Sequence, residues 1–104
     1  MIKVSYQKND LGNYNFLSVK GHANSDIVND IDIVCAIVSS IVIGGLNNIE
    51  DIDNYICDIK SGDVTVVIKK YNAHDNIVID TILEQIYVLK SKKNEYIEIL
   101  EKRG

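Results

Sequence analysis

A long uncharged stretch, residues 33–46, constrains the fold of this chain more than any other feature. β-Branched residues dominate the stretch, so propensity alone favours a strand. Its length of about 14 residues favours a buried helix instead, because an ordinary strand is shorter. Asp32 is a suitable N-cap in front of the stretch, and the glycine pair at 44–45 is a suitable stop. We therefore predict a helix over 33–46.

Alternating and helical patterns on either side predict the other main elements. Residues 2–7 and 14–20 alternate between apolar and polar side chains and flank a turn sequence, which indicates a hairpin. Residues 54–60 and 63–70 flank Ser-Gly and predict a second hairpin. Residues 76–91 place apolar side chains three and four positions apart, which predicts an amphipathic helix.

Two less regular regions complete the pattern. Residues 21–31 are polar, and we predict a loop there. Residues 95–100 alternate weakly, and we interpret them as a last strand rather than as a helical extension. The elements together predict one α+β domain over 1–104, with two layers. Two long helices would pack on a mostly antiparallel sheet that is built from the two hairpins.

Composition and charge exclude several classes of protein. The 104 residues carry a formal net charge of −4, so the chain lacks the basic surface of a nucleic-acid-binding protein. No run of uncharged apolar residues is long enough for a transmembrane helix, and the first residues lack the layout of a signal peptide. We expect a cytoplasmic protein with reduced cysteines. The two cysteines and two histidines show no metal-ligand spacing, so we expect no metal and no cofactor.

Cys35 and His22 are the strongest candidates for chemistry. Cys35 stands three residues after Asp32, in the first turn of the predicted helix, where unpaired N–H groups and the helix dipole favour thiolate over thiol. His22 follows Gly21 at the end of a predicted strand, and this strand end can meet the helix start across residues 23–31. An imidazolium there would stabilise the thiolate and protonate a leaving group. A small buried residue is the alternative interpretation of Cys35.

The other chemically capable residues favour structural interpretations. Cys57 alternates within a predicted strand and lacks a CxxC partner, so we predict that it packs structurally. We predict that His74 is a loop histidine. Asp26, Asp30 and Asp32 resemble a cation site, but the glycine and distal glutamate of a calcium loop are missing. We interpret all but Asp32 as solvated loop charges.

Two short motifs stand in a specific order and spacing. They are Gly21-His22-Ala23 and Asp32-Ile33-Val34-Cys35-Ala36, with Ser39 four residues after the cysteine. These motifs resemble the bacterial Prp family of ribosomal-processing cysteine proteases, also called YsxB-like proteins. The resemblance implies that Cys35 is the nucleophile and that His22 is the general base and proton donor. It also implies supporting positions at Gly21, Asp32 and Ser39.

The same resemblance implies a substrate and a partner. The expected activity is removal of the N-terminal extension of large-subunit ribosomal protein twenty-seven, and the expected assembly is a homodimer. The sequence departs from the family pattern in residues 23–31, which lack the usual glycine and aromatic residue. His22 and Cys35 are thirteen residues apart, one more than the pattern leads us to expect.

Two other classes of function stay open at this point. A non-catalytic, ribosome-associated module could bind a peptide along an exposed strand such as 2–7 or 63–70. That alternative predicts a buried Cys35 that reacts slowly. A thiol redox sensor is the other alternative, and it requires Cys57 to lie near Cys35 as a resolving thiol.

Overall fold

The computed structural model describes residues 1–22, 27–28, 31–51, 53, 55–60 and 62–102. For six of these residues it describes the backbone alone: Ile27, Val28, Ile31, Cys57, Ile59 and Lys60. The main strands are β1 (Ile2–Lys8), β2 (Tyr14–Lys20), β5 (Tyr55–Lys60), β6 (Asp63–Ile68) and β7 (Ile97–Lys102). They form a five-stranded sheet in the order β5-β6-β2-β1-β7.

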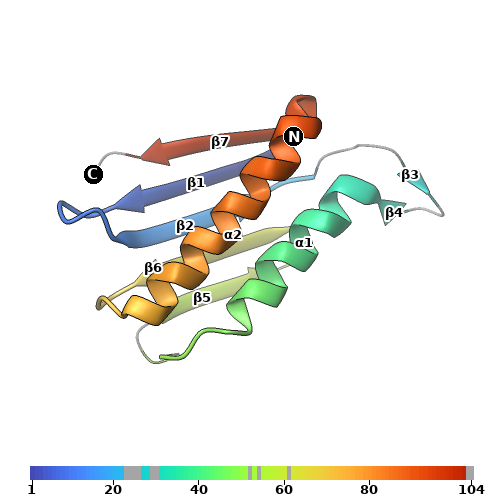
Figure 1. Cartoon of the computed structure of the whole chain (residues 1–104). Helices are drawn as coiled ribbons and strands as arrows, with labels where there is room; N and C mark the ends of the chain where they lie inside the picture. Colours follow the sequence, from blue (N-terminus) through green and yellow to red (C-terminus); the bar gives the residue numbers. More distant parts are fainter. Residues whose placement is uncertain (23–26, 29–30, 52, 54, 61, 103–104) are drawn as a thin grey trace.

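Two long helices, α1 (Ile33–Leu46) and α2 (Ala73–Lys92), cover one face of this sheet (Figure 1). A 3₁₀ turn, η2 (Asn94–Tyr96), joins α2 to β7. This arrangement confirms the predicted two-layer α+β fold. Neither helix is long and apolar enough to cross a membrane, within the part of the chain that the structure describes.

Both predicted hairpins are present and lie side by side in the sheet. β1 pairs with β2, β5 pairs with β6, and β2 joins the two hairpins by pairing with β6; all three pairings are antiparallel. β7 confirms the predicted last strand and pairs parallel to β1, with Ile2 opposite Ile97. The sequence did not predict this parallel pairing, because the weak alternation of 95–100 does not indicate which edge of the sheet the strand joins.

The core lies between the helices and the covered face of the sheet. α1 buries Val34, Val38 and Val42, which are spaced four residues apart and therefore share one face of the helix. The buried residues of α2 and of the sheet complete the core: Val78, Ile79, Ile82, Leu83 and Ile86 from α2, and Ile2, Val4, Leu17, Val19, Val64, Val66 and Ile97 from the strands. Each fully buried aliphatic side chain contributes about 1.5–3 kcal/mol. This burial explains why β-branched residues form a helix over 33–46.

Two predictions were wrong in detail. The segment 21–31 is not entirely a loop, because β3 (Ile27–Val28) and β4 (Ile31–Asp32) form a short antiparallel pair. Two-residue strands are too short to show alternation. The second helix begins at residue 73 rather than 76, because the side chain of Asn72 caps it by accepting a hydrogen bond from the N–H of Asp75 at 3.1 Å.

Candidate active site

The first turn of α1 holds an available thiol. Asp32 has an extended backbone and its side chain accepts a hydrogen bond from the N–H of Cys35 at 3.2 Å, which confirms the predicted N-cap. Cys35 forms no disulfide and is partly exposed. It lies beside the buried stripe of α1 rather than within it, so its sulfur can be reached from solvent.

The end of β2 fixes the backbone that carries His22. Gly21 has a φ of +95°, and a Cβ atom there would lie 2.7 Å from the carbonyl oxygen of Met1. The Gly21 N–H donates to the carbonyl of Gly62 at 3.0 Å, and the nitrogen of Met1 donates to the carbonyl of His22 at 2.7 Å. Contacts on two sides therefore hold the chain where the imidazole emerges.

The structure brings the side chains of Cys35 and His22 together. The Cys35 Sγ lies 3.7 Å from the Nδ1 of His22 and 3.9 Å from the carbonyl oxygen of Gly21. His22 is exposed. A proton can pass from the thiol to Nδ1 across this contact, and the thiolate–imidazolium pair that results would be nucleophilic.

Ser39 lies on α1, and Asp32 caps the start of this helix. Ser39 is exposed one turn beyond Cys35, and within the described residues it makes no hydrogen bond to the cysteine. Asp32 occupies the N–H of Cys35, so this N–H is already paired in the substrate-free site. When the sulfur attacks a carbonyl carbon, the oxyanion of the resulting intermediate would therefore compete with Asp32 for that N–H.

Other residues singled out in the sequence lie away from this pair or outside the described residues. Cys57 stands on β5 opposite Val66, and its side chain is among those not described. Asp26 and Asp30 also lie outside the described residues. The prediction that His74 is a loop histidine was wrong, because it lies in the first turn of α2.

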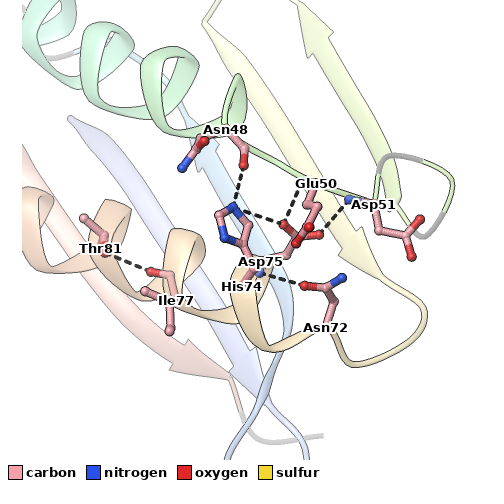
Figure 2. Close-up of polar contacts among 8 residues, drawn as sticks. All are labelled: Asn48, Glu50, Asp51, Asn72, His74, Asp75, Ile77 and Thr81. Atoms are coloured by element: carbon pink, nitrogen blue, oxygen red, sulfur yellow. Dashed lines mark hydrogen bonds and ion pairs between the residues drawn. The ribbon is translucent and has the colours of Figure 1, made fainter.

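A second polar cluster gathers around the start of α2 (Figure 2). Asp75 has 0% relative exposure, and its two carboxylate oxygens accept hydrogen bonds from the N–H groups of Glu50 at 2.7 Å and Asp51 at 3.0 Å. Burial opposes ionisation of this carboxyl, but the Glu50 N–H, the Tyr55 hydroxyl and the Asp51 N–H together outweigh it. The pKa of Asp75 therefore lies below its ordinary value.

Potential metal ligands are present in this cluster, and two of them, His74 and Asp75, make other hydrogen bonds. One donor atom each from Glu50, His74 and Asp75 lie within 4.8 Å of one another. His74 Nε2 is 3.0 Å from the carbonyl oxygen of Asn48, and the Asp75 oxygens hold backbone N–H groups. We interpret the cluster as a structural link between α2 and the segment after α1. Spacing along the sequence did not reveal it, because it joins distant segments.

The groove between the two helices also lies away from the cysteine. Its volume is about 560 Å³, and α1 lines it with residues from its second half, including Ile41 and Gly44. α2 contributes Ile77 and Thr81. Neither Cys35 nor His22 lines this groove.

A partly exposed thiol beside an exposed imidazole, at the start of a helix in a two-layer α+β fold, defines the class of cysteine-dependent hydrolases. The model of the cysteine protease Prp family matches residues 1–98. The chain belongs to this family and is a cysteine protease.

Solved structures agree with this assignment. The ribosomal processing protease Prp from Staphylococcus aureus, in complex with a covalently linked product peptide, is 26% identical and superposes with a TM-score of 0.84. The alignment covers 98% of this chain and 100% of that one. The same S. aureus protease in complex with a substrate peptide is 25% identical, with a TM-score of 0.79 and coverage of 98% and 100%.

A Streptococcus mutans protein of known structure is 19% identical, with a TM-score of 0.71 and coverage of 98% and 99%, and this likeness concerns the fold alone. The search of curated proteins found no match.

Proposed function

We propose that Cys35 is the nucleophile and His22 the general base and acid of a peptide-cleaving site. The observation that carries the proposal is the contact of 3.7 Å between Cys35 Sγ and His22 Nδ1 at the capped start of α1. Family membership supports peptide-bond hydrolysis as the reaction. Gly21 and Asp32 support the pair through the turn and the cap already described, and Ser39 completes the motif on the same helix.

Acylation begins when His22 Nδ1 takes the thiol proton and the sulfur of Cys35 attacks the scissile carbonyl carbon. The C–S bond forms, and the tetrahedral intermediate then expels the amine as the C–N bond breaks. His22 returns its proton to that amine. The covalently linked peptide in the similar S. aureus protease supports a covalent route here.

Deacylation uses the same two residues in reverse roles. His22 accepts a proton from water, and the hydroxide attacks the thioester carbonyl. The C–S bond breaks, the peptide leaves as a carboxylic acid that releases its proton to solvent, and Cys35 is restored as a thiol with the proton that His22 returns. The oxyanion needs N–H donors, each worth about 3 kcal/mol. The Cys35 N–H can be one of these donors once its hydrogen bond to Asp32 breaks and it donates to the oxyanion instead.

The proposed substrate is the N-terminal extension of large-subunit ribosomal protein twenty-seven. The similar S. aureus protein is a ribosomal processing protease, and both of its structures contain a bound peptide. This similarity supports an extended peptide of a ribosomal protein as the substrate here. The chain would act in the cytoplasm as a single-domain homodimer. Its net charge of −4 would favour approach of a basic ribosomal protein over a short distance.

Cleavage of a synthetic peptide that spans the extension and the first mature residues tests the proposal. Wild type, Cys35→Ala and His22→Ala are compared, and the products are identified by mass spectrometry. A single cut by wild type that both substitutions abolish is the expected result. A cut that persists in Cys35→Ala would refute the assigned nucleophile.

The binding-module alternative fits the structure less well than proteolysis. It requires a buried Cys35 that reacts slowly, whereas Cys35 is partly exposed and lies beside an exposed histidine. Tight peptide binding by wild type without any cleavage would favour the alternative. The redox-sensor alternative depends on the side chain of Cys57, which lies outside the described residues.

A further inference from the structure

The turn between β5 and β6 places Gly62 beside the imidazole of His22. Gly62 lies in this turn with a φ of +74°, and a Cβ atom built on it would lie 3.1 Å from both Cε1 and Nε2 of His22. The Nδ1 of the same ring faces Cys35 Sγ at 3.7 Å. The ring is therefore held between the sulfur and the backbone of Gly62.

The same glycine also holds the backbone of the histidine segment. The Gly62 carbonyl accepts a hydrogen bond from the N–H of Gly21 at 3.0 Å. Gly62 thus helps to fix the backbone of residues 21 and 22, although it lies about forty residues further along the chain. It also limits where the His22 ring can move. Among the residues that the structure describes, no carboxylate is bonded to the ring, so packing has a large share in setting its orientation.

A side chain at position 62 would disturb this arrangement. A separation of 3.1 Å from two ring atoms is shorter than ordinary van der Waals contact, so the ring would have to move by a few tenths of an ångström. Movement away from Gly62 changes the contact of 3.7 Å between Nδ1 and the sulfur. Proton transfer across that contact depends steeply on its geometry.

We propose that Gly62 is a positioning residue, whose lack of a side chain lets the β5–β6 turn hold the His22 imidazole at the distance needed to deprotonate Cys35. The inference rests on the proposed function, since it assigns His22 the role of base. It adds a residue that lies outside both family-like motifs and on a different hairpin.

Gly12 provides a matched control. It lies in the β1–β2 turn with a φ of +80°, and a Cβ atom there meets nothing within 4 Å. Alanine at either position therefore carries the same strain of a left-handed backbone, but only position 62 adds a contact with the histidine. Asparagine tolerates this backbone conformation better than alanine, so Gly62→Asn and Gly12→Asn reduce the strain and keep the added Cβ.

The experiment compares all four variants with wild type in cleavage of the ribosomal peptide and in the pH profile of Cys35 alkylation by iodoacetamide, followed on the peptide that contains Cys35. We expect kcat/KM to fall about 10-fold for both Gly62 variants, mainly through kcat, and to stay within about twofold for both Gly12 variants. The alkylation profile should change shape for the Gly62 variants only, at similar Tm. Gly62 variants whose alkylation profiles match those of their Gly12 counterparts would overturn the proposal.

The two proposals fail in distinguishable ways. Absence of cleavage by folded wild type would count against the proposed function. The positioning role of Gly62 is then tested by the alkylation profile alone. A profile that differs between Gly62→Asn and Gly12→Asn then supports the positioning role, because alkylation requires no peptide substrate. Identical profiles reject it, whatever the cleavage assay gives.

Discussion

The two long helices begin with the same kind of side-chain cap, but the ionisable residue beside the cap is reactive in α1 and structural in α2. In α1 the Asp32 side chain accepts from the N–H of Cys35 at 3.2 Å, and in α2 the Asn72 side chain accepts from the N–H of Asp75 at 3.1 Å. The third helical residue is thus an ionisable group in both helices, and a histidine lies nearby in each. Cap geometry alone does not separate a reactive site from a structural one.

Burial and the number of bonds separate them. Asp75 is fully buried, and each of its oxygens accepts a backbone N–H, so its bonding capacity is used within the protein. Cys35 is partly exposed, and among the described residues its sulfur makes only long contacts, of 3.7 and 3.9 Å. The comparison indicates that α1 presents its group to an outside reactant, whereas α2 uses its group to fix the chain.

The largest expected effect is on activity at the start of α1. Cys35→Ala should lower kcat/KM by about 10⁴-fold, because the nucleophile is removed. The same change should alter the free energy of unfolding by less than about 1 kcal/mol, because the side chain is only partly buried. Peptide cleavage and urea unfolding of the same preparations measure both quantities. A large loss of stability would show that Cys35 is a structural residue like Asp75.

The reverse pattern is expected at the start of α2. Asp75→Ala leaves the N–H groups of Glu50 and Asp51 without their acceptor in a buried site, and should cost about 3 kcal/mol of stability. Glu84→Gln is the control, since it neutralises an exposed carboxylate on the same helix. Urea unfolding at pH 7 gives the difference. Equal midpoints for the two variants would contradict a structural role for Asp75.

The pH dependence of stability follows from the same carboxyl. Its pKa is lowered in the folded protein from the ordinary value of 3.8, so Asp75 stabilises the fold fully above that value. The contribution is lost as the pH falls below 3.8 and through the lower folded pKa. Comparison of the unfolding free energies of wild type and Asp75→Asn between pH 7 and pH 2 should show the difference narrowing at the acid end.

The sequence predicted the start of α1 better than the start of α2, for a physical reason. Asp32 and Cys35 are close in sequence, so cap and thiol could be inferred from local rules, and His22 could be inferred from its place at the end of a predicted strand. Asp75 takes its role from bonds to Glu50 and Asp51, which only the tertiary fold brings near. The two layers were predictable from periodicity, whereas the parallel partner of β7 was not, because pairing depends on distant strands.

The contact between the end of α1 and the middle of α2 tests whether packing between the helices affects the start of α1. A Cβ atom on Gly45 would overlap Ile82 Cγ1 and lie 2.6 Å from its Cδ1, whereas one on Gly44 meets nothing within 4 Å. Gly45→Ala should therefore destabilise the fold by about 2 kcal/mol. Gly44→Ala should stabilise it by about 0.5–1 kcal/mol through helix propensity.

Both glycines lie near the end of α1 opposite Cys35. We therefore expect kcat/KM at 25 °C to stay within about twofold for both variants, since misplacement near the site would cost far more. Thermal unfolding and peptide cleavage check the pair. A tenfold loss of activity in Gly45→Ala alone would show that packing between the end of α1 and the middle of α2 sets the geometry of the start of α1.

The smallest effect concerns the charge of the α1 cap. Asp32→Asn keeps a side-chain oxygen that can accept from the Cys35 N–H at 3.2 Å but removes a negative charge close to the sulfur. Because like charge disfavours a thiolate, alkylation of Cys35 by iodoacetamide at pH 7 should become about two- to fivefold faster. Asp32→Ala removes both charge and cap, and should also cost about 1 kcal/mol of stability. If Cys35 is alkylated at the same rate in Asp32→Asn and in wild type, the charge of Asp32 has no effect on the thiol. The two helix starts then differ only in the exposure and the bonding partners of the third helical residue.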